Sequence, residues 1–123
     1  MGAHILVVDD DPGIRFALAL KLKHHGYSVS EATDGAEAVA FLAQTPADLV
    51  VLDVGMPRMD GYTAAKHLYA DPATRALPVV FLTAQNLEVP AAVQPLIGRH
   101  RFLTKPFSPR DVVAAVEALL RGA

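Results

Sequence analysis

Several side chains with useful chemistry each follow a hydrophobic run of the sequence. Three consecutive acids, Asp9-Asp10-Asp11, follow the first run, and Asp53 follows another. Thr83 ends a third run, and Lys105 follows a short fourth one. If these runs are parallel strands of one sheet, their carboxyl ends lie at one edge and the side chains converge there. The expected group is two or three carboxylates, one hydroxyl and one ammonium.

Such a group has a definite chemistry. Carboxylates packed within about 4–6 Å of one another have raised pKa values unless a cation offsets their repulsion. One lysine offsets part of this charge, and a divalent cation offsets more. Oxygen ligands without histidine or cysteine suit a hard ion, and a small number of carboxylates suits Mg²⁺ better than Ca²⁺. A carboxylate beside such an ion can attack phosphorus, so the pattern points to phosphoryl transfer.

Five short segments are predicted as strands. Residues 5–8, 49–52 and 79–82 are apolar throughout, which is typical of strands buried on both faces of a parallel sheet. Residues 27–31 alternate and are more polar, so we expect this strand at an edge. A short last strand is expected around residues 101–103.

Helices are predicted between these strands. Asp11-Pro12 is an N-cap followed by proline, and the helix that it opens ends at His25-Gly26. Residues 36–42 and 61–69 are predicted as two further helices. The run Ser108-Pro109-Arg110-Asp111 is a capping box that opens the last helix.

Strands that alternate with five helical segments predict an α/β fold with right-handed crossovers. An edge position for the second strand fits the flavodoxin-like order 2-1-3-4-5, in which a five-stranded parallel sheet is doubly wound by helices. Residues 1–123 are expected to form a single domain.

The composition limits the function classes. The net charge of −2 gives no general attraction to nucleic acid or to anionic membranes, and we expect neither as a direct partner. The absence of cysteine excludes disulfides and thiolate metal sites and suits the cytoplasm, where we expect the protein. The first residues have the pattern of neither a signal peptide nor a membrane span.

Taken together, four motifs resemble the receiver domains of two-component response regulators, of the kind found in chemotaxis regulators. They are Leu6-Val7-Val8-Asp9-Asp10, the segment 53–61 from Asp53 to Gly61, Leu82-Thr83-Ala84, and Lys105-Pro106-Phe107. All four stand in the family's order and at compatible spacing. The resemblance covers the whole chain.

The resemblance implies a role for each matching residue in binding Mg²⁺. Asp53 is the expected phospho-acceptor and also a metal ligand. Asp10 is expected to contact the ion directly, Asp9 to contact it through water, and the backbone carbonyl of Gly55 to complete the protein ligands.

The resemblance also implies roles in holding the phosphoryl group and in switching. Thr83 is expected to bond the phosphoryl group, and Ala84 to leave room for it. Lys105 is expected to pair with the acyl phosphate and to form a cis bond to Pro106. Phe102 matches the aromatic residue that turns inward once Thr83 has moved.

The resemblance implies a phosphorelay function. A sensor histidine kinase or a histidine phosphotransfer protein would donate the phosphoryl group, and the switched face would bind a downstream output partner. The domain would catalyse its own phosphorylation and dephosphorylation but would not be a turnover enzyme.

Other interpretations remain open at this level. A flavodoxin-like binder of flavin or nucleotide would need a phosphate-binding loop where Asp9-Asp10-Asp11 stands. A pseudo-receiver would keep the fold as a protein-binding scaffold without the chemistry. Asp11 is predicted to be only a helix cap, and Phe102 has the alternative of an ordinary core aromatic.

Two features depart from the family pattern. Residues 85–97 contain Pro90 and Pro95, so a helix there should be short, displaced or partly unwound. Arg99 and Arg101 flank His100 just before the switch aromatic and are hypothesised to form a basic rim for an acidic partner, with plain solvated arginines as the alternative.

Overall fold

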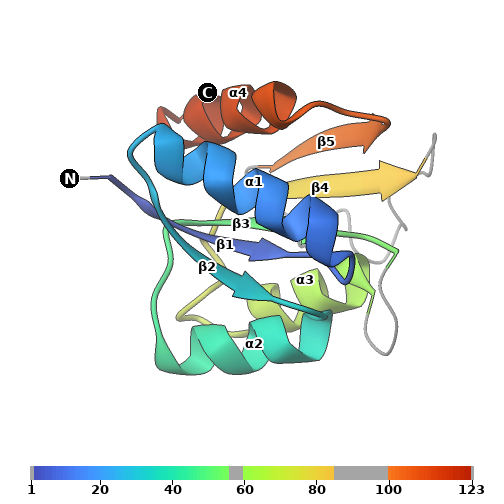
Figure 1. Ribbon diagram of the computed structural model, residues 1–123. Helices are drawn as coiled ribbons and strands as arrows, with labels where there is room; N and C mark the ends of the chain where they lie inside the picture. Colours follow the sequence, from blue (N-terminus) through green and yellow to red (C-terminus); the bar gives the residue numbers. More distant parts are fainter. Residues whose placement is uncertain (1, 56–59, 85–99, 123) are drawn as a thin grey trace.

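The computed structural model describes residues 2–55, 60–84 and 100–122, in which one parallel sheet is covered by helices on both faces (Figure 1). The strand order is β2-β1-β3-β4-β5, with every neighbouring pair parallel. The predicted flavodoxin-like order is therefore confirmed. The strands are β1 (His4–Val8), β2 (Ser28–Ala32), β3 (Leu49–Asp53), β4 (Val79–Ala84) and β5 (His100–Lys105).

Four helices are present in the described residues, two on each face of the sheet. Helices α1 and α4 cover one face, and α2 and α3 cover the other (Figure 1). Their bounds are α1 (Pro12–His24), α2 (Gly35–Gln44), α3 (Gly61–Ala70) and α4 (Pro109–Leu120). The helix considered within residues 85–97 lies outside the described residues. No helix in the described part of the chain is long and apolar enough to cross a membrane.

The apolar strands are buried because their side chains pack into two hydrophobic cores, one on each face of the sheet. Ile5 and Val7 of β1 belong to the cluster that contains the buried residues of α1 and α4. Leu6 and Val8 belong to the cluster that contains those of α2 and α3. Side chains alternate along a strand, so a strand between two helix layers needs an apolar residue at every position.

Helix starts follow the predicted capping chemistry. The side chain of Asp11 accepts hydrogen bonds from Gly13 N at 2.9 Å and Ile14 N at 3.2 Å, which confirms it as an N-cap. Ser108 and Asp111 form the predicted capping box. Asp60 caps α3 in the same way, through Thr63 N at 2.8 Å.

One local expectation needs correction. Strand β5 has six residues and is as long as β4, because it pairs with β4 along its whole length.

In α1, Leu18 and Leu22 are buried, whereas Phe16 and Leu20 are exposed. The helix therefore carries more apolar surface than the sheet covers.

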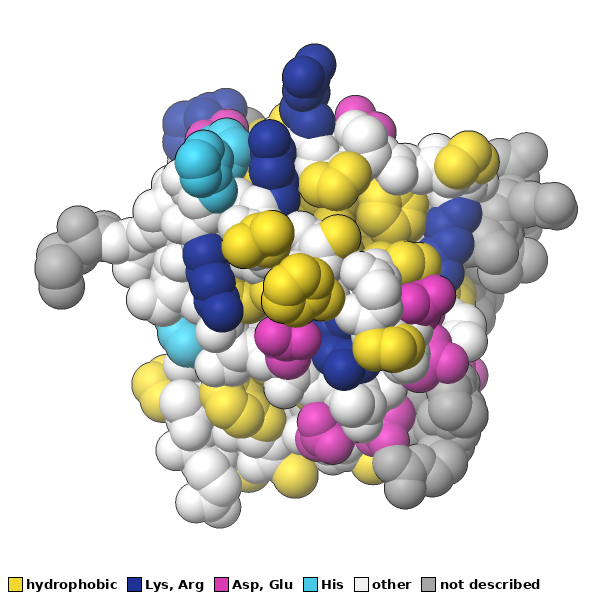
Figure 2. Space-filling view, in the orientation of Figure 1, with side chains coloured by type: hydrophobic (Ala, Val, Ile, Leu, Met, Phe, Trp, Pro, Cys, Tyr) yellow, Lys and Arg dark blue, Asp and Glu magenta, His cyan; other side chains and the backbone are white. Residues whose placement is uncertain are grey.

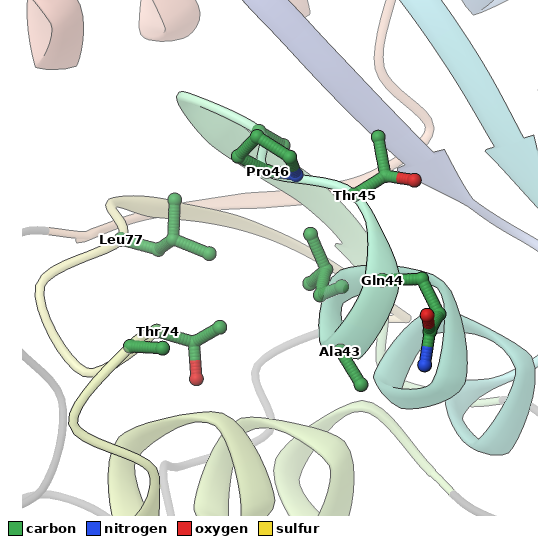
Figure 3. A pocket seen from close by; sticks show the side chains of 9 residues that line it. Ala43, Gln44, Thr45, Pro46, Thr74 and Leu77 are labelled. Atoms are coloured by element: carbon green, nitrogen blue, oxygen red, sulfur yellow. The ribbon is translucent and has the colours of Figure 1, made fainter.

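A pocket of about 200 Å³ lies at the amino ends of β3 and β4, between the end of α2 and the segment before β4 (Figure 3). Ala43, Gln44 and Pro46 line it from the end of α2 and the segment that follows, Thr74 and Leu77 line it from the segment before β4, and no acidic, lysine or histidine side chain is among its lining residues (Figure 3). The pocket lies at the edge of the sheet opposite to Asp53.

Gly61 allows α3 to start directly against the end of β3. Its N–H donates to the carbonyl of Val54 at 3.0 Å. A Cβ at this position would lie 2.6 Å from the Asp53 carbonyl oxygen and 2.8 Å from Val54 Cα. Only glycine permits this approach without a shift of the backbone that carries Asp53.

We therefore expect Gly61→Ala to lower the free energy of unfolding by roughly 1–3 kcal/mol, the usual cost of overpacking. Gly55→Ala is the control, because a Cβ there meets nothing within 4 Å. Urea denaturation of both variants would measure the difference. Equal stability of the two variants would contradict this account of Gly61.

Candidate functional site

The carboxyl ends of the strands bring the predicted site residues together. Asp53 is the last residue of β3 and Asp9 follows β1, and their exposed fractions are only 2% and 0%. Asp10 is exposed beside them. One carboxylate oxygen from each of these three acids lies within 4.8 Å of the other two. Asp11 is not part of this cluster.

A lysine from the last strand faces the same carboxylates. Nζ of Lys105 lies 3.3 Å from Oδ1 of Asp53, and the same oxygen accepts a long hydrogen bond of 3.3 Å from Gly55 N. The Lys105–Pro106 peptide bond is cis, as the resemblance implied. The lysine side chain remains one-third exposed, so its charge is partly shared with solvent.

Backbone hydrogen bonds hold the acidic turn in place. Asp9 N donates to the carbonyl of Ala32 on β2 at 3.2 Å. The Asp9 carboxylate accepts from Asp11 N at 2.9 Å through Oδ1. The Asp9 carbonyl accepts from Arg15 Nη1 at 2.9 Å.

The electrostatics of the cluster appear most clearly at Asp9. Burial raises the pKa of its carboxyl from the ordinary 3.8 to about 6. The hydrogen bond from Asp11 N lowers this pKa, and the negative charge of Asp53 raises it. The charges of Lys105 and Asp10 have smaller effects: Lys105 lowers the pKa and Asp10 raises it. The charged form is therefore disfavoured overall, and Lys105 does not compensate.

Two buried oxygens at this edge have no hydrogen-bond partner among the residues that the structure describes. They are Oδ2 of Asp9 and Oγ1 of Thr83, which is itself 3% exposed at the end of β4. A buried polar atom without a partner costs free energy, so a ligand that contacts it is favoured. An all-oxygen donor set with uncompensated negative charge fits a hard divalent cation such as Mg²⁺.

The aromatic position on β5 lies against the core. The ring of Phe102 is half-buried and stacks on Phe81 of β4, with centroids 5.0 Å apart and an interplanar angle of 14°. His100 contacts the edge of the same ring at 5.1 Å. This packing agrees with the core interpretation of Phe102, and the switch role stays a prediction.

Some residues at this edge were not found by sequence reasoning. Arg15 supports the acidic turn from outside the motif positions, and the close packing of Gly61, the last motif position, on the Asp53 backbone was not foreseen. Arg15 stands four residues after the cap Asp11, a spacing that could have signalled a contact back to the turn. Arg101 is exposed on β5, and Arg99 lies outside the described residues, so the basic rim stays a hypothesis.

Comparison with known proteins agrees with this geometry. Residues 5–117 match the model of the response regulator receiver domain, and the chain belongs to this family. Receiver domains of response regulators are phosphorylated on an aspartate in two-component signalling, and they are not metabolic enzymes. They interact with histidine kinases or phosphotransfer proteins and with output domains.

The chain matches some relatives over half of their length and others over nearly all of it. The alkaline phosphatase synthesis transcriptional regulatory protein PhoP of Bacillus subtilis is 40% identical over 121 residues, which cover 98% of this chain and 50% of that protein. Protein PilH of Pseudomonas aeruginosa is 33% identical over 98% of this chain and 99% of its own length. The chain spans about half the length of the first curated relatives that it matches.

A solved structure gives the same fold. The receiver domain of the sensor histidine kinase PA1611 from Pseudomonas aeruginosa superposes with a TM-score of 0.85 at 28% identity, with all of both chains covered. That structure has a magnesium ion coordinated in its active site cleft.

The Asp9 pKa predicts a dependence of stability on pH in the metal-free protein. The folded protein retains a proton on Asp9 up to about pH 6, whereas the unfolded chain releases it near 3.8. The contribution of Asp9 to the free energy of unfolding therefore falls as pH rises through this interval and levels off above it. Asp9→Asn should gain stability over wild type across the same interval, on the order of 3 kcal/mol.

Urea denaturation in EDTA at several pH values would measure this difference. Addition of Mg²⁺ at neutral pH should reverse the order, because the ion stabilises the folded wild type by binding to it. Asp11→Asn, which keeps a capping side chain, serves as the control. An advantage of Asp9→Asn that did not change with pH would contradict this electrostatic account.

Proposed function

We propose that this domain accepts a phosphoryl group on Asp53 in a reaction that requires Mg²⁺. The observation that carries the proposal is a buried Asp53 whose carboxylate meets two further carboxylates within 4.8 Å and a lysine at 3.3 Å. Asp10, Asp53 and the backbone carbonyl of Gly55 would hold the ion directly, and Asp9 would hold it through water. When bound, the ion supplies positive charge that offsets the carboxylates and the incoming phosphoryl oxygens.

The side chains of this chain then have separable tasks. A carboxylate oxygen of Asp53 attacks phosphorus, the P–N bond of a phosphohistidine breaks, and its electron pair stays with the imidazole nitrogen. The ammonium of Lys105 and the hydroxyl of Thr83 hold two of the phosphoryl oxygens during this transfer. Water later attacks the same phosphorus and releases inorganic phosphate and the Asp53 carboxylate. The domain would thus catalyse only its own modification.

We propose that the acyl phosphate shifts a two-state equilibrium through Thr83 and Phe102. The unpartnered hydroxyl of Thr83 gains a bond when the phosphoryl group is present, so the phosphorylated form favours a displaced Thr83. The ring of Phe102 packs against β4, the strand that carries Thr83, and can follow its movement. The changed face would bind a downstream output partner.

The phosphodonor is proposed to be a sensor histidine kinase or a histidine phosphotransfer protein. Phe16 and Leu20 on α1 are 64% and 58% exposed, and they are the large hydrophobic side chains most exposed in the described residues. Hydrophobic side chains gather over α1 in the face that Figure 2 shows. Beside them an open groove of about 440 Å³ is lined by Leu20, Lys21 and Pro109 among others. Helix α1 starts directly after the acidic turn, so a protein seated along this helix lies on an element that begins at the site.

Residues 1–123 are proposed to form the receiver domain, and the cytoplasm is proposed as its location. Three acids at the end of β1 disfavour the flavin or nucleotide binder, because they repel a phosphate where such proteins hold one. A pseudo-receiver would keep the fold and fail the chemical test below.

The chemical test is intact-mass measurement after treatment with acetyl phosphate and Mg²⁺. Wild type should gain one phosphoryl group, and Asp53→Asn or wild type in EDTA should gain none. Lys105→Met should slow the reaction by roughly 10²–10³-fold, as expected for loss of one group that stabilises the transferring oxygens. Asp11→Asn is the matched acid control and should react like wild type. Phosphorylation of Asp53→Asn at the wild-type rate would overturn the assignment of the acceptor.

The docking face predicts a split between donors. The double variant Phe16→Ala with Leu20→Ala should react with acetyl phosphate at the wild-type rate, because neither residue contacts the carboxylate cluster. Its transfer from a phosphorylated histidine protein should fall at least about tenfold, since it loses two exposed apolar anchors. The exposed pair Lys66→Ala with His67→Ala on α3 is the control. Equal loss with both donors would place the effect in the chemistry and not in docking.

A further inference from the structure

Arg15 connects the acidic turn to the edge strand of the sheet. Its Nη1 donates to the carbonyl oxygen of Asp9 at 2.9 Å, and its Nε donates to Oε1 of Glu31 at 3.0 Å. Glu31 lies on β2, and Arg15 lies in the first turn of α1. The Arg15 side chain is only 18% exposed, so the guanidinium is held between these two acceptors.

The contact of Arg15 with the Asp9 carbonyl fixes the orientation of the peptide group between Asp9 and Asp10. The Asp9 C=O and the Asp10 N–H belong to one rigid peptide plane. The Asp9 N–H is fixed by Ala32, and the Asp9 side chain is fixed by Asp11 N. The carbonyl is the remaining polar group of Asp9 that can rotate the next peptide, and Arg15 holds it. The direction in which the Asp10 side chain leaves the turn therefore depends on Arg15.

Asp10 needs such support from its backbone. It is the exposed member of the carboxylate cluster, and none of the described residues donates a hydrogen bond to its carboxylate. We propose that Arg15, anchored by Glu31, is a positioning residue for the cation site, which aims Asp10 at the ion through the Asp9 carbonyl. This inference rests on the proposed Mg²⁺ site and adds residues that contact neither the ion nor the phosphoryl group.

The geometry requires arginine and not merely a positive charge. Two donors of one planar guanidinium reach two acceptors on different elements, and a lysine ammonium on a flexible stem does not reproduce this fork. An alternative is that Arg15 acts only as a nearby cation. The two accounts predict opposite results, because loss of a nearby positive charge would strengthen Mg²⁺ binding, and Lys would replace Arg without effect.

The test is calorimetric titration of Mg²⁺ into wild type, Arg15→Lys, Arg15→Met and Glu31→Ala. We expect both Arg15 variants to bind Mg²⁺ about tenfold more weakly, which is the low end of effects from residues that orient metal ligands. At saturating Mg²⁺ the rate of acetyl phosphate transfer should return close to that of wild type. Arg75→Lys and Arg75→Met, at an exposed arginine before β4, are the matched controls and should not change the affinity.

Two further measurements separate positioning from charge and from general loss of structure. Glu31→Ala should weaken binding in the wild-type background but have no effect in Arg15→Met, because its effect passes through Arg15. In metal-free protein, amide hydrogen exchange of Asp11 should speed up in both Arg15 variants while the exchange of β3 amides is unchanged.

Each outcome is decisive. If wild type binds Mg²⁺ and Arg15→Lys binds it equally well, the inference about Arg15 is overturned and the proposed function stands. If Arg15→Met binds more tightly, Arg15 acts as a charge. If wild type itself does not bind Mg²⁺, both the inference and the proposed function are overturned.

Discussion

Asp9 and Asp53 hold two carboxylates out of water at the ends of adjacent strands, and most features of this edge of the molecule follow from that crowding. A carboxylate that is removed from solvent is unfavourable in its charged form, and the raised pKa of Asp9 reflects this cost. Lys105 contacts Asp53 but stays partly exposed, so it offsets only part of the charge. The charge that remains is what a further cation at this site would offset, as the proposed function requires.

The parallel sheet makes such a site mechanically possible. Every strand of a doubly wound sheet ends at the same edge as its neighbours, and each helix that follows starts there. The positive ends of helix dipoles therefore lie on the side of the carboxylates. Asp11, Asp60 and Ser108 cap three of these helices, so the first turns that adjoin the site are fixed by hydrogen bonds.

Rigidity at the site comes from contacts outside the reacting groups. Gly61 lets α3 pack directly on the backbone of Asp53, and Arg15 holds the carbonyl before Asp10. Both contacts are made to the backbone, so a glycine and an arginine can each fix the backbone position of an acidic residue of the site. The exposed apolar side chains of α1 belong to the same helix as Arg15, so the proposed docking face and the proposed support of the acidic turn lie on one element.

The sequence alone determined the strands, the caps and the membership of the carboxylate group. Apolar runs such as residues 49–52 and cap residues such as Asp11 act through local chemistry, which operates wherever the segment is placed. Tertiary structure alone decided how fully each side of α1 is covered, with Leu18 and Leu22 buried and Phe16 and Leu20 exposed. It also decided the length of β5, through pairing with β4, and the grip of Arg15 on the Asp9 carbonyl. The pairing of β5 with β4 joins segments separated by residues 85–99, and the contact of Arg15 depends on the angle at which α1 leaves the turn, so no local pattern alone fixes either geometry.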